Sequence, residues 1–437
     1  MIGAGAAGLT LARELAGSKL AVCVLESGDR LAAPVPDPLY HVHSSALVVA
    51  QDSRVRAFGG TTTVWSGRWK HFDEIDLEPR DWVAGSGWPI TFAALQPYRA
   101  RADAAAGIAP ATPVKSWFRS DALVPTVFAT QPAARRDWGA GYADAPNVGL
   151  HLGAHVLRIE RRGTKVQRIH VRDARGDWTI EPRVAVVAAG GIENARLLLL
   201  SELGNPHDQV GRYYMDHPKL KLGVVETYDP LERSAWDASG EDAPSYLGFR
   251  LADAVQREHR VLNSHVLFQP LFERDLVRRV VRRARLPASC RLLSVRNYLE
   301  QQPEPDNRVR LHDELDPLGL RKAAVHWTLG ELDRRTMVVF HEVLRRELQR
   351  ARIGELDSPL LRGGNFDEVG DASHHMGTTR MGSDPRSSVV DAHCRVHDVD
   401  NLFMAGSSVF PTSGYANPTA TIAALAIRLA DHLKELL

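Results

Sequence analysis

The sequence is poor in cysteine and lacks any long apolar run, and each shortage excludes a class of protein. Its 437 residues contain 3 cysteines, whose wide spacing fits neither a disulfide framework nor a metal or redox motif. No apolar run approaches the roughly 18 residues of a membrane span. The chain enters a glycine-rich turn at once, without a basic and apolar leader. A cytoplasmic protein without a membrane span or a metal site is therefore expected.

The positive and negative charges of the sequence are nearly balanced. The 54 basic residues almost balance the 53 acidic ones, which leaves a net charge of +1. Nucleic acid and anionic surfaces are therefore not expected as main partners. The apolar fraction of 44% and the charged fraction of 24% are ordinary for a globular protein. The length exceeds that of one hydrophobic core, so two closely packed domains are expected.

The first informative feature present is a glycine turn at the start of the chain. The segment Gly3–Gly8 has the spacing Gly-x-Gly-x-x-Gly and precedes a predicted helix at 8–16 and a buried strand at 20–25. Such glycines allow a tight turn, close approach to a pyrophosphate, and helix–strand packing. Glu26 follows at the usual distance of about 20 residues, where its carboxylate can accept ribose hydroxyls and disfavours a 2′-phosphate. FAD and NAD both fit; NADP does not.

The predicted cofactor contacts of this unit are Gly3, Gly5, Ala6, Ala7, Gly8, Glu26 and Ser27. Only Met1 and Ile2 precede the turn, so either the chain starts further upstream or its first strand is nearly absent. A second stretch of small residues is either a plain loop or a backbone laid against a flavin ring. Its predicted contacts are Gly59, Gly60, Thr61, Val64, Trp65, Ser66 and Gly67.

A histidine and an asparagine near the C-terminus form the predicted catalytic pair. Removing a hydride from an alcohol requires a base for the hydroxyl proton, and His374 suits that task. Asn417 can hold the same oxygen, although a position just before Pro418 also suits a helix cap. His375 competes for the role of base, but the spacing to the following glycine favours His374.

Two other features are predicted to be structural. His217 is interpreted as a satisfied structural histidine. The basic run 278–285 is interpreted as a solvated helix face, with a membrane-surface or partner role as the alternative. Further helices are predicted at 92–106, 193–201, 332–351 and 419–436 and β-runs at 149–159, 166–171, 177–181 and 184–189, with longer strands between 219 and 330. No element is predicted at 108–145.

These pieces together resemble the glucose–methanol–choline (GMC) family of FAD oxidoreductases. The resemblance covers nearly the whole chain, in the family's order of motifs. It rests on Gly3–Gly8 with Glu26, Gly59–Gly60, Val187–Ser201, Val210–Pro218, Asn307–Leu311 with Asp316–Gly319, His374–Gly377 and Asn417–Thr419. The sequence looks most like the sugar-oxidising branch, near pyranose oxidases and fructose or gluconate dehydrogenases.

The resemblance implies an α/β fold, in which an FAD-binding Rossmann-like domain is interleaved with an α+β substrate domain built on an antiparallel sheet. The implied FAD-binding domain comprises 1–72, 146–218 and 386–437, and the substrate domain comprises 73–145 and 219–385. The resemblance also implies a His–Asn pair at the flavin. Further implied cofactor contacts are Val156, Ala189, Gly190, Asn194, Gly406, Ser407, Asn417, Pro418 and Thr419.

Two departures from the family pattern refine this expectation. Val64 stands where pyranose oxidases carry a flavin-linked histidine, so non-covalent FAD is expected. Gly406 and Ser407 stand where many members have an acidic residue.

The predicted activity is FAD-dependent oxidation of an alcohol to a carbonyl, and analogy with the family points to a sugar or sugar-like polyol. In this hypothesis His374 takes the proton, the hydride passes to flavin N5, and Asn417 positions the substrate oxygen. Oxygen or another acceptor would then reoxidise the flavin. Two alternatives stay open: a redox-neutral lyase on the same scaffold, and a flavin-poor binding protein, which the short first strand motivates.

Overall fold

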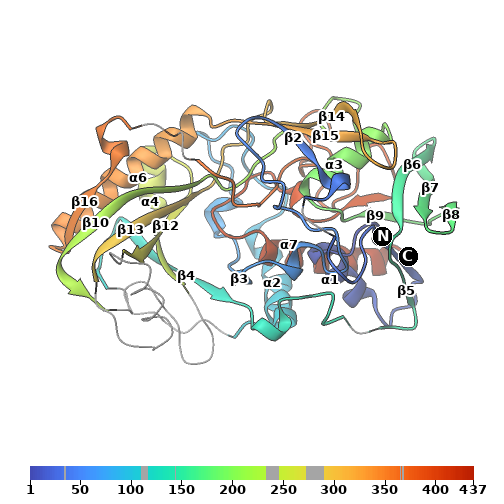
Figure 1. Cartoon of the computed structure of the whole chain (residues 1–437), viewed down its shortest axis with the longest axis horizontal. Coiled ribbons are helices and arrows are strands. Elements are labelled where there is room, and N and C mark those ends of the chain that lie inside the picture. The colour runs from blue at the N-terminus through green and yellow to red at the C-terminus, as the bar shows by residue number, and fades with distance from the viewer. Residues whose placement is uncertain are drawn as a thin grey trace.

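The computed structural model describes residues 1–33, 36–109, 117–142, 144–232, 246–271, 290–364, 366 and 369–437. The predicted basic helix face at 278–285 lies outside these residues. Figure 1 shows a large antiparallel sheet at one end of the molecule and a smaller parallel sheet, with both termini, at the other. Among the described residues, no helix combines the length and apolar character required to cross a bilayer.

The parallel sheet is built from two strand pairs joined by a single residue. These pairs are β1 (Val22–Leu25) with β5 (Val148–His151), and β9 (Ala185–Val187) with β17 (Leu402–Met404). Ile2 bridges Leu25 on one side and Val187 on the other, in parallel on both. Its amide donates to Val186 at 2.8 Å, and its carbonyl accepts from Ala188 at 2.7 Å. The nearly absent first strand thus still occupies the centre of the sheet.

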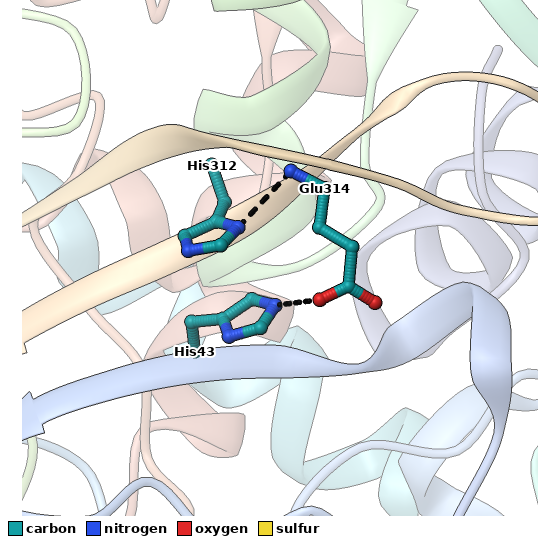
Figure 2. A group of neighbouring side chains, drawn as sticks. All are labelled: His43, His312 and Glu314. Atoms are coloured by element: carbon teal, nitrogen blue, oxygen red, sulfur yellow. Dashed lines mark hydrogen bonds and ion pairs between the residues drawn. The ribbon is translucent and has the colours of Figure 1, made fainter.

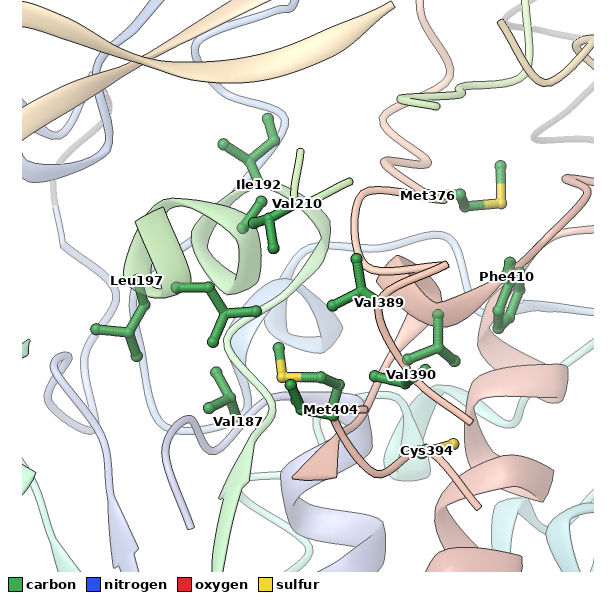
Figure 3. Close-up of a cluster of buried hydrophobic side chains, with 14 of the residues drawn as sticks. Val187, Ile192, Leu197, Val210, Met376, Val389, Val390, Cys394, Met404 and Phe410 are labelled. Atoms are coloured by element: carbon green, nitrogen blue, oxygen red, sulfur yellow. The ribbon is translucent and has the colours of Figure 1, made fainter. Parts of the chain in front are cut away.

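Helices cover both faces of this parallel sheet. Because side chains alternate along a strand, Val186 and Phe403 face α1 (Ala6–Leu15) and α7 (Thr419–Leu436). Val187 and Met404 face α3 (Gly191–Leu200) on the other side, in the core shown in Figure 3. All three helices begin beside the carboxyl ends of the strands, which is where open α/β sheets bind ligands.

The large sheet has seven antiparallel strands. In spatial order they are β16 (Gly354–Asp357), β10 (Lys219–Leu231), β13 (Cys290–Leu299), β12 (Ser264–Pro270), β11 (Tyr246–Leu251), β4 (Leu123–Thr130) and β3 (Arg68–Trp69). The helix α6 (Glu331–Arg350) packs Phe340 and Leu344 against Val266 and Val295 on one face. Strand β4 lies in the stretch where no element was predicted, because Pro125 inside the strand masks its pattern.

Two three-stranded sheets complete the β-structure. They are β6 (His155–Arg162), β7 (Lys165–Asp173) and β8 (Gly176–Ile180), and β14 (Arg308–Leu315), β15 (Arg321–Trp327) and β2 (Val42–Ala46). The predicted run 149–159 is wrong as one strand. It breaks at Gly153, whose φ of 63° turns the chain from the parallel sheet into β6.

The remaining helices are short or peripheral. They are α2 (Phe92–Ala106), α4 (Asp253–His259) and single 3₁₀ turns at Pro38–Tyr40, Gly60–Thr63, Glu74–Asp76, Ala133–Arg135, Pro359–Arg362 and Ser407–Val409. The chain leaves the parallel sheet after β1, returns for β5 and β9, and returns again for β17. We propose that the predicted domain boundaries lie where the chain passes between the parallel sheet and the seven-stranded sheet.

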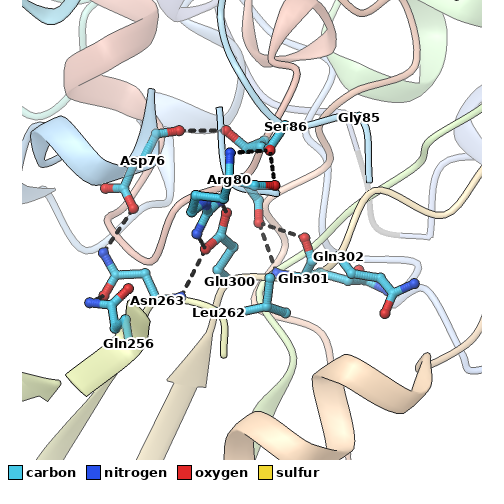
Figure 4. Close-up of polar contacts among 12 residues, drawn as sticks. Asp76, Arg80, Gly85, Ser86, Gln256, Leu262, Asn263, Glu300, Gln301 and Gln302 are labelled. Carbon is cyan, nitrogen blue, oxygen red and sulfur yellow. Dashed lines mark hydrogen bonds and ion pairs between the residues drawn. The ribbon is translucent and has the colours of Figure 1, made fainter. Parts of the chain in front are cut away.

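A buried ion pair ties the large sheet to the loop that follows β3. The side chains of Arg80 and Glu300 are both fully buried and bond through both guanidinium Nη atoms. Glu300 also accepts from the Asn263 amide at 2.9 Å, and Asn263 donates to Asp76 at 2.8 Å (Figure 4). Removing one member of such a network leaves an unpaired buried charge.

We therefore expect Arg80→Met to lower the free energy of unfolding by about 3–5 kcal/mol. The matched control is Arg172→Met, which removes an exposed bidentate pair with Asp177. That change should leave the free energy of unfolding nearly unchanged, because an exposed pair is screened by water. Urea unfolding followed by circular dichroism measures both. Equal effects for the two variants would contradict the assignment of a structural role to the buried pair.

Candidate active site

One cavity of about 510 Å³ lies where the N-termini of α1, α3 and α7 meet the loop after β2. Its size is typical of a pocket for a small molecule or cofactor. The candidate base His374 lines it together with His375. The predicted cofactor contacts in its wall are Gly3, Gly5, Ala6, Ala7, Glu26, Ser27, Gly60, Thr61, Val64, Trp65, Ser66, Val156, Ala189, Gly190, Gly406, Ser407, Asn417, Pro418 and Thr419.

Four predicted contacts do not line the cavity, and three of them have clear supporting roles. A Cβ on Gly8 would lie 2.0 Å from the Gly3 carbonyl, so this glycine permits the turn itself. The Gly59 amide donates to the Ala4 carbonyl at 2.9 Å and holds the second glycine segment against the first. Asn194 accepts from the Ala189 amide at 2.7 Å and donates to the Ala405 carbonyl at 3.0 Å. Gly67, the fourth, adopts a left-handed φ of 73° at the end of its loop.

The shape of the wall fits a dinucleotide. Gly5 and Gly60 approach so closely that a Cβ on Gly60 would lie 2.9 Å from the Gly5 Cα. A Cβ on Gly5 itself would have no neighbour nearer than 3.9 Å and would project into open space. The first N–H groups of a helix have no partner within it, so the start of α1 offers donors to a phosphate at this point.

Glu26 sits at the end of β1, as the ribose position requires. Its two carboxylate oxygens accept from the Ala4 amide at 2.8 Å and from the Gly28 amide at 2.7 Å. Burial raises the pKa of Glu26, and these two amides oppose that shift. The carboxylate is therefore oriented by backbone while its remaining lone pairs stay available for hydroxyl groups.

His374 and Asn417 meet in the cavity although they belong to distant segments. The Asn417 side-chain nitrogen lies 3.3 Å from His374 Nε2. The alternative that Asn417 serves only as a helix cap is not supported, because Pro418 is the N-cap of α7 and no side chain caps that end. The amide of Asn417 therefore points at the imidazole.

His217 decides which nitrogen of His374 carries a proton. His217 Nε2 lies 3.1 Å from the Ser413 carbonyl, which can only accept, so Nε2 must be protonated. Burial lowers the pKa of His217 to about 4, so its ring is neutral and Nδ1 must accept. His374 Nδ1, 2.8 Å away, then donates. The lone pair of His374 is left on Nε2, beside Asn417.

A buried carboxylate holds the backbone of this segment. Asp216 accepts from the amides of His217 at 2.5 Å, Ala372 at 3.0 Å and His374 at 3.2 Å. Burial, together with the neighbouring Asp371 carboxyl, raises the pKa of Asp216. The residue before the base, Ser373, takes a left-handed φ of 63°. Asp216 therefore stabilises a strained turn that presents the imidazole.

His375 has a different environment from its neighbour. Its ring stacks on Tyr214 at a centroid distance of 5.9 Å, and its Nε2 is buried without a hydrogen-bond partner. Burial lowers the pKa of His375 to about 3. Among the described residues His375 forms no hydrogen bond with Asn417, whereas His374 does.

His217, Asp216 and the carbonyl of Ser413 were not identified as site residues from the sequence. His217 is buried and bonded through both nitrogens, as expected of a structural histidine, but one of its partners is His374. The only available signal was the adjacent Asp216-His217-Pro218 motif, whose distance along the chain from residue 374 hides the contact.

A second histidine cluster lies outside this cavity, on the sheet of β14, β15 and β2 (Figure 2). The rings of His43 and His312 stack at 3.7 Å with an interplanar angle of 10°. His43 Nε2 lies 3.0 Å from a Glu314 oxygen, and Lys322 bonds the same carboxylate. Because His312 Nδ1 already accepts from the Glu314 amide at 3.1 Å and an ammonium bonds the carboxylate, we interpret this group as a surface charge network.

Comparison with known proteins identifies a family and several relatives that this chain resembles in sequence. Two family models, both described as GMC oxidoreductase, match residues 133–219 and 303–426. The large subunit of fructose dehydrogenase from Gluconobacter japonicus is 25% identical, over 99% of this chain and 96% of that protein. Paromamine 6′-oxidase from Streptomyces fradiae is 26% identical, over 98% and 90%. A C-glycoside 3-oxidase from Microbacterium trichothecenolyticum is 32% identical, over 66% and 54%.

Solved structures share the fold. Pyridoxine 4-oxidase from Mesorbium loti superposes with a TM-score of 0.63 at 17% identity, over 99% of this chain and 98% of that one. Formate oxidase from Aspergillus oryzae superposes with a TM-score of 0.65 at 16% identity, over 100% and 97%. The chain belongs to the GMC oxidoreductase family. It is thus an oxidoreductase for CH–OH donors, and its cofactor is FAD.

Proposed function

We propose that this enzyme oxidises an alcohol group of a sugar or sugar-like polyol to a carbonyl, with His374 as the base. The contact that carries the proposal is the 3.3 Å approach of Asn417 to His374 Nε2, inside the cavity that the glycine turn borders. The names of fructose dehydrogenase and paromamine 6′-oxidase, each matched over at least nine-tenths of its length, support the substrate class.

The residues of this chain would divide the work as follows. When bound, FAD supplies an acceptor for the hydride of the carbinol carbon at its N5 atom. His374 Nε2, whose lone pair the His217 contact leaves free, takes the hydroxyl proton. Asn417 donates to the same substrate oxygen and holds it beside that nitrogen. The N-terminus of α7 directs its positive end toward the cavity and stabilises negative charge there.

We further propose that FAD is held without a covalent bond. Val64 lines the cavity and is 60% exposed, and its side chain has no atom able to bond a flavin carbon. Acid precipitation of the loaded enzyme should therefore release all of its flavin into the supernatant. After each turnover, oxygen or another electron acceptor would reoxidise the reduced flavin.

The decisive experiment is anaerobic mixing of the loaded, yellow enzyme with a panel of sugars, polyols and simple alcohols. Bleaching of the flavin absorbance by a member of the panel would support alcohol oxidation. Turnover of an alcohol derivative without any bleaching would instead indicate a redox-neutral lyase. Protein that stays colourless after FAD is added would contradict the enzyme assignment.

The pH dependence of flavin reduction tests the state of the base. Burial lowers the pKa of His374 well below its ordinary range, and neighbouring charges including Lys219 and Arg68 lower it further. A lowered pKa keeps the imidazole unprotonated in mild acid. The reduction rate should therefore stay level from pH 8 to the ordinary histidine pKa of about 6.5 and fall only below it. An acid limb centred above that value would contradict this assignment.

His217 is proposed as a positioning residue, and a pair of variants separates this role from packing. His217→Leu fills the space but cannot accept from His374 Nδ1, so flavin reduction should slow about tenfold to a hundredfold. His217→Gln keeps an acceptor and a donor and should recover part of the rate. Stopped-flow reduction at several pH values measures both. If the two variants reduced flavin at equal rates, His217 would contribute to the site only through packing.

A further inference from the structure

Arg68 is an unpaired cation in the wall of the active-site cavity. Four arginines line this cavity, and three bond carboxylates: Arg54 with Glu193 at 2.7 Å, Arg56 with Asp37 at 2.7 Å, and Arg196 with Asp316 at 2.6 Å. Arg68 makes no ion pair or side-chain hydrogen bond with any residue that the structure describes, and its Nε is buried without a partner. The side chain of Arg68 is partly buried, and a ligand with complementary charge would supply the partner that its Nε lacks.

The guanidinium of Arg68 is held in a defined orientation. Its carbon lies 4.4 Å from the centroid of the Tyr246 ring, which belongs to β11 of the seven-stranded sheet. A stacked guanidinium keeps its N–H groups free in the plane of the fork. The Tyr246 contact therefore fixes the cation without consuming its hydrogen-bond donors.

A second unpartnered polar group lies beside it. Arg68 pairs across strands with Thr130, so both side chains project from the same face of the sheet. The Thr130 hydroxyl is also buried without a hydrogen-bond partner. Arg68 and the candidate base His374 both line the cavity. Thr130 does not line the cavity, so Arg68 is the unmet polar group of this pair that faces it.

We propose that Arg68 binds a carboxylate of the substrate, so that the oxidised alcohol is a hydroxy acid or sugar acid. This inference rests on the proposed function and narrows its substrate class. An arginine fork matches the two oxygens of a carboxylate. The carboxylate would hold the substrate on the sheet side while its carbinol group reaches His374.

The test is binding of a carboxylate that the enzyme cannot oxidise. FAD-loaded enzyme is titrated with acetate, and with acetamide as its neutral counterpart, while the flavin absorbance is recorded. Acetate should cause a saturable spectral change that acetamide does not cause. Arg68→Met should weaken acetate binding about tenfold or more. Arg68→Lys keeps the charge without the fork, so its affinity for acetate should lie between those of Arg68→Met and the unaltered enzyme. The matched control is Arg296→Met.

Arg296 suits that purpose because it is also unpaired among the described residues, lies on β13 of the same sheet, and does not line the cavity. Its replacement should leave acetate affinity unchanged. The proposal is overturned if acetate gives no change with the unaltered enzyme, or if Arg68→Met binds acetate equally well. Loss of FAD from Arg68→Met would overturn it too, by assigning Arg68 to the cofactor. Because acetate binding needs no oxidation, bleaching by alcohols tests the proposed function separately.

Discussion

His374→Ala is expected to slow flavin reduction by an alcohol about 10²- to 10⁴-fold, the range that a positioned general base contributes. The imidazole is the group in contact with Asn417, and its lone pair is directed there by His217. FAD content should remain unchanged, because no glycine of the cradle is altered. Anaerobic stopped-flow reduction at saturating substrate measures the effect.

His375→Ala is the matched comparison for this variant. His375 lines the same cavity, but it stacks on Tyr214 and does not contact Asn417. Its removal should alter packing and slow reduction far less than the loss of His374. If the two effects were reversed, the neighbouring histidine would be the base and the proposed proton path would be wrong.

Gly5→Ala is the second change with a large expected effect, this time on cofactor retention. The backbone of Gly5 has φ −84° and ψ −160°, which alanine adopts without strain, and the new methyl group would enter the open cavity. It should clash with a pyrophosphate there. A steric cost of about 1–3 kcal/mol corresponds to FAD binding weakened roughly five- to 150-fold. Titration of the FAD-free protein with FAD measures this change.

Gly149→Ala provides the control for that experiment. Gly149 lies in β5, and a Cβ there would have no neighbour nearer than 3.9 Å, as at Gly5, but it would not face the cavity. FAD affinity should therefore match that of the unaltered protein. Both variants should unfold at the same urea concentration as the parent, so weaker binding by Gly5→Ala would not reflect a damaged fold. Unchanged affinity of Gly5→Ala would place the pyrophosphate elsewhere.

Local patterns were sufficient for the parts of the fold that depend on neighbours in sequence. The apolar periodicity of α7 predicted that helix with its observed bounds, and the helix predicted at 92–106 likewise matches α2. Cofactor and family were likewise predicted, since glycine turns and their spacing have a local steric cause. Strand β4 was not predicted, because Pro125 disrupts its local pattern. Only pairing with β11 and β3 makes this segment a strand.

The sequence by itself determined the glycine turn, the acidic strand end at Glu26, and the residue types available for alcohol oxidation. Only the tertiary structure decided that Ser413, His217 and His374 form one chain of hydrogen bonds. It likewise decided that Arg68, alone among the cavity arginines, has no carboxylate partner in the described part of the chain. The physical reason is the separation along the chain over which each interaction acts. Backbone sterics act between adjacent residues, whereas the protonation of an imidazole and the pairing of a cation depend on groups that folding brings together from distant segments.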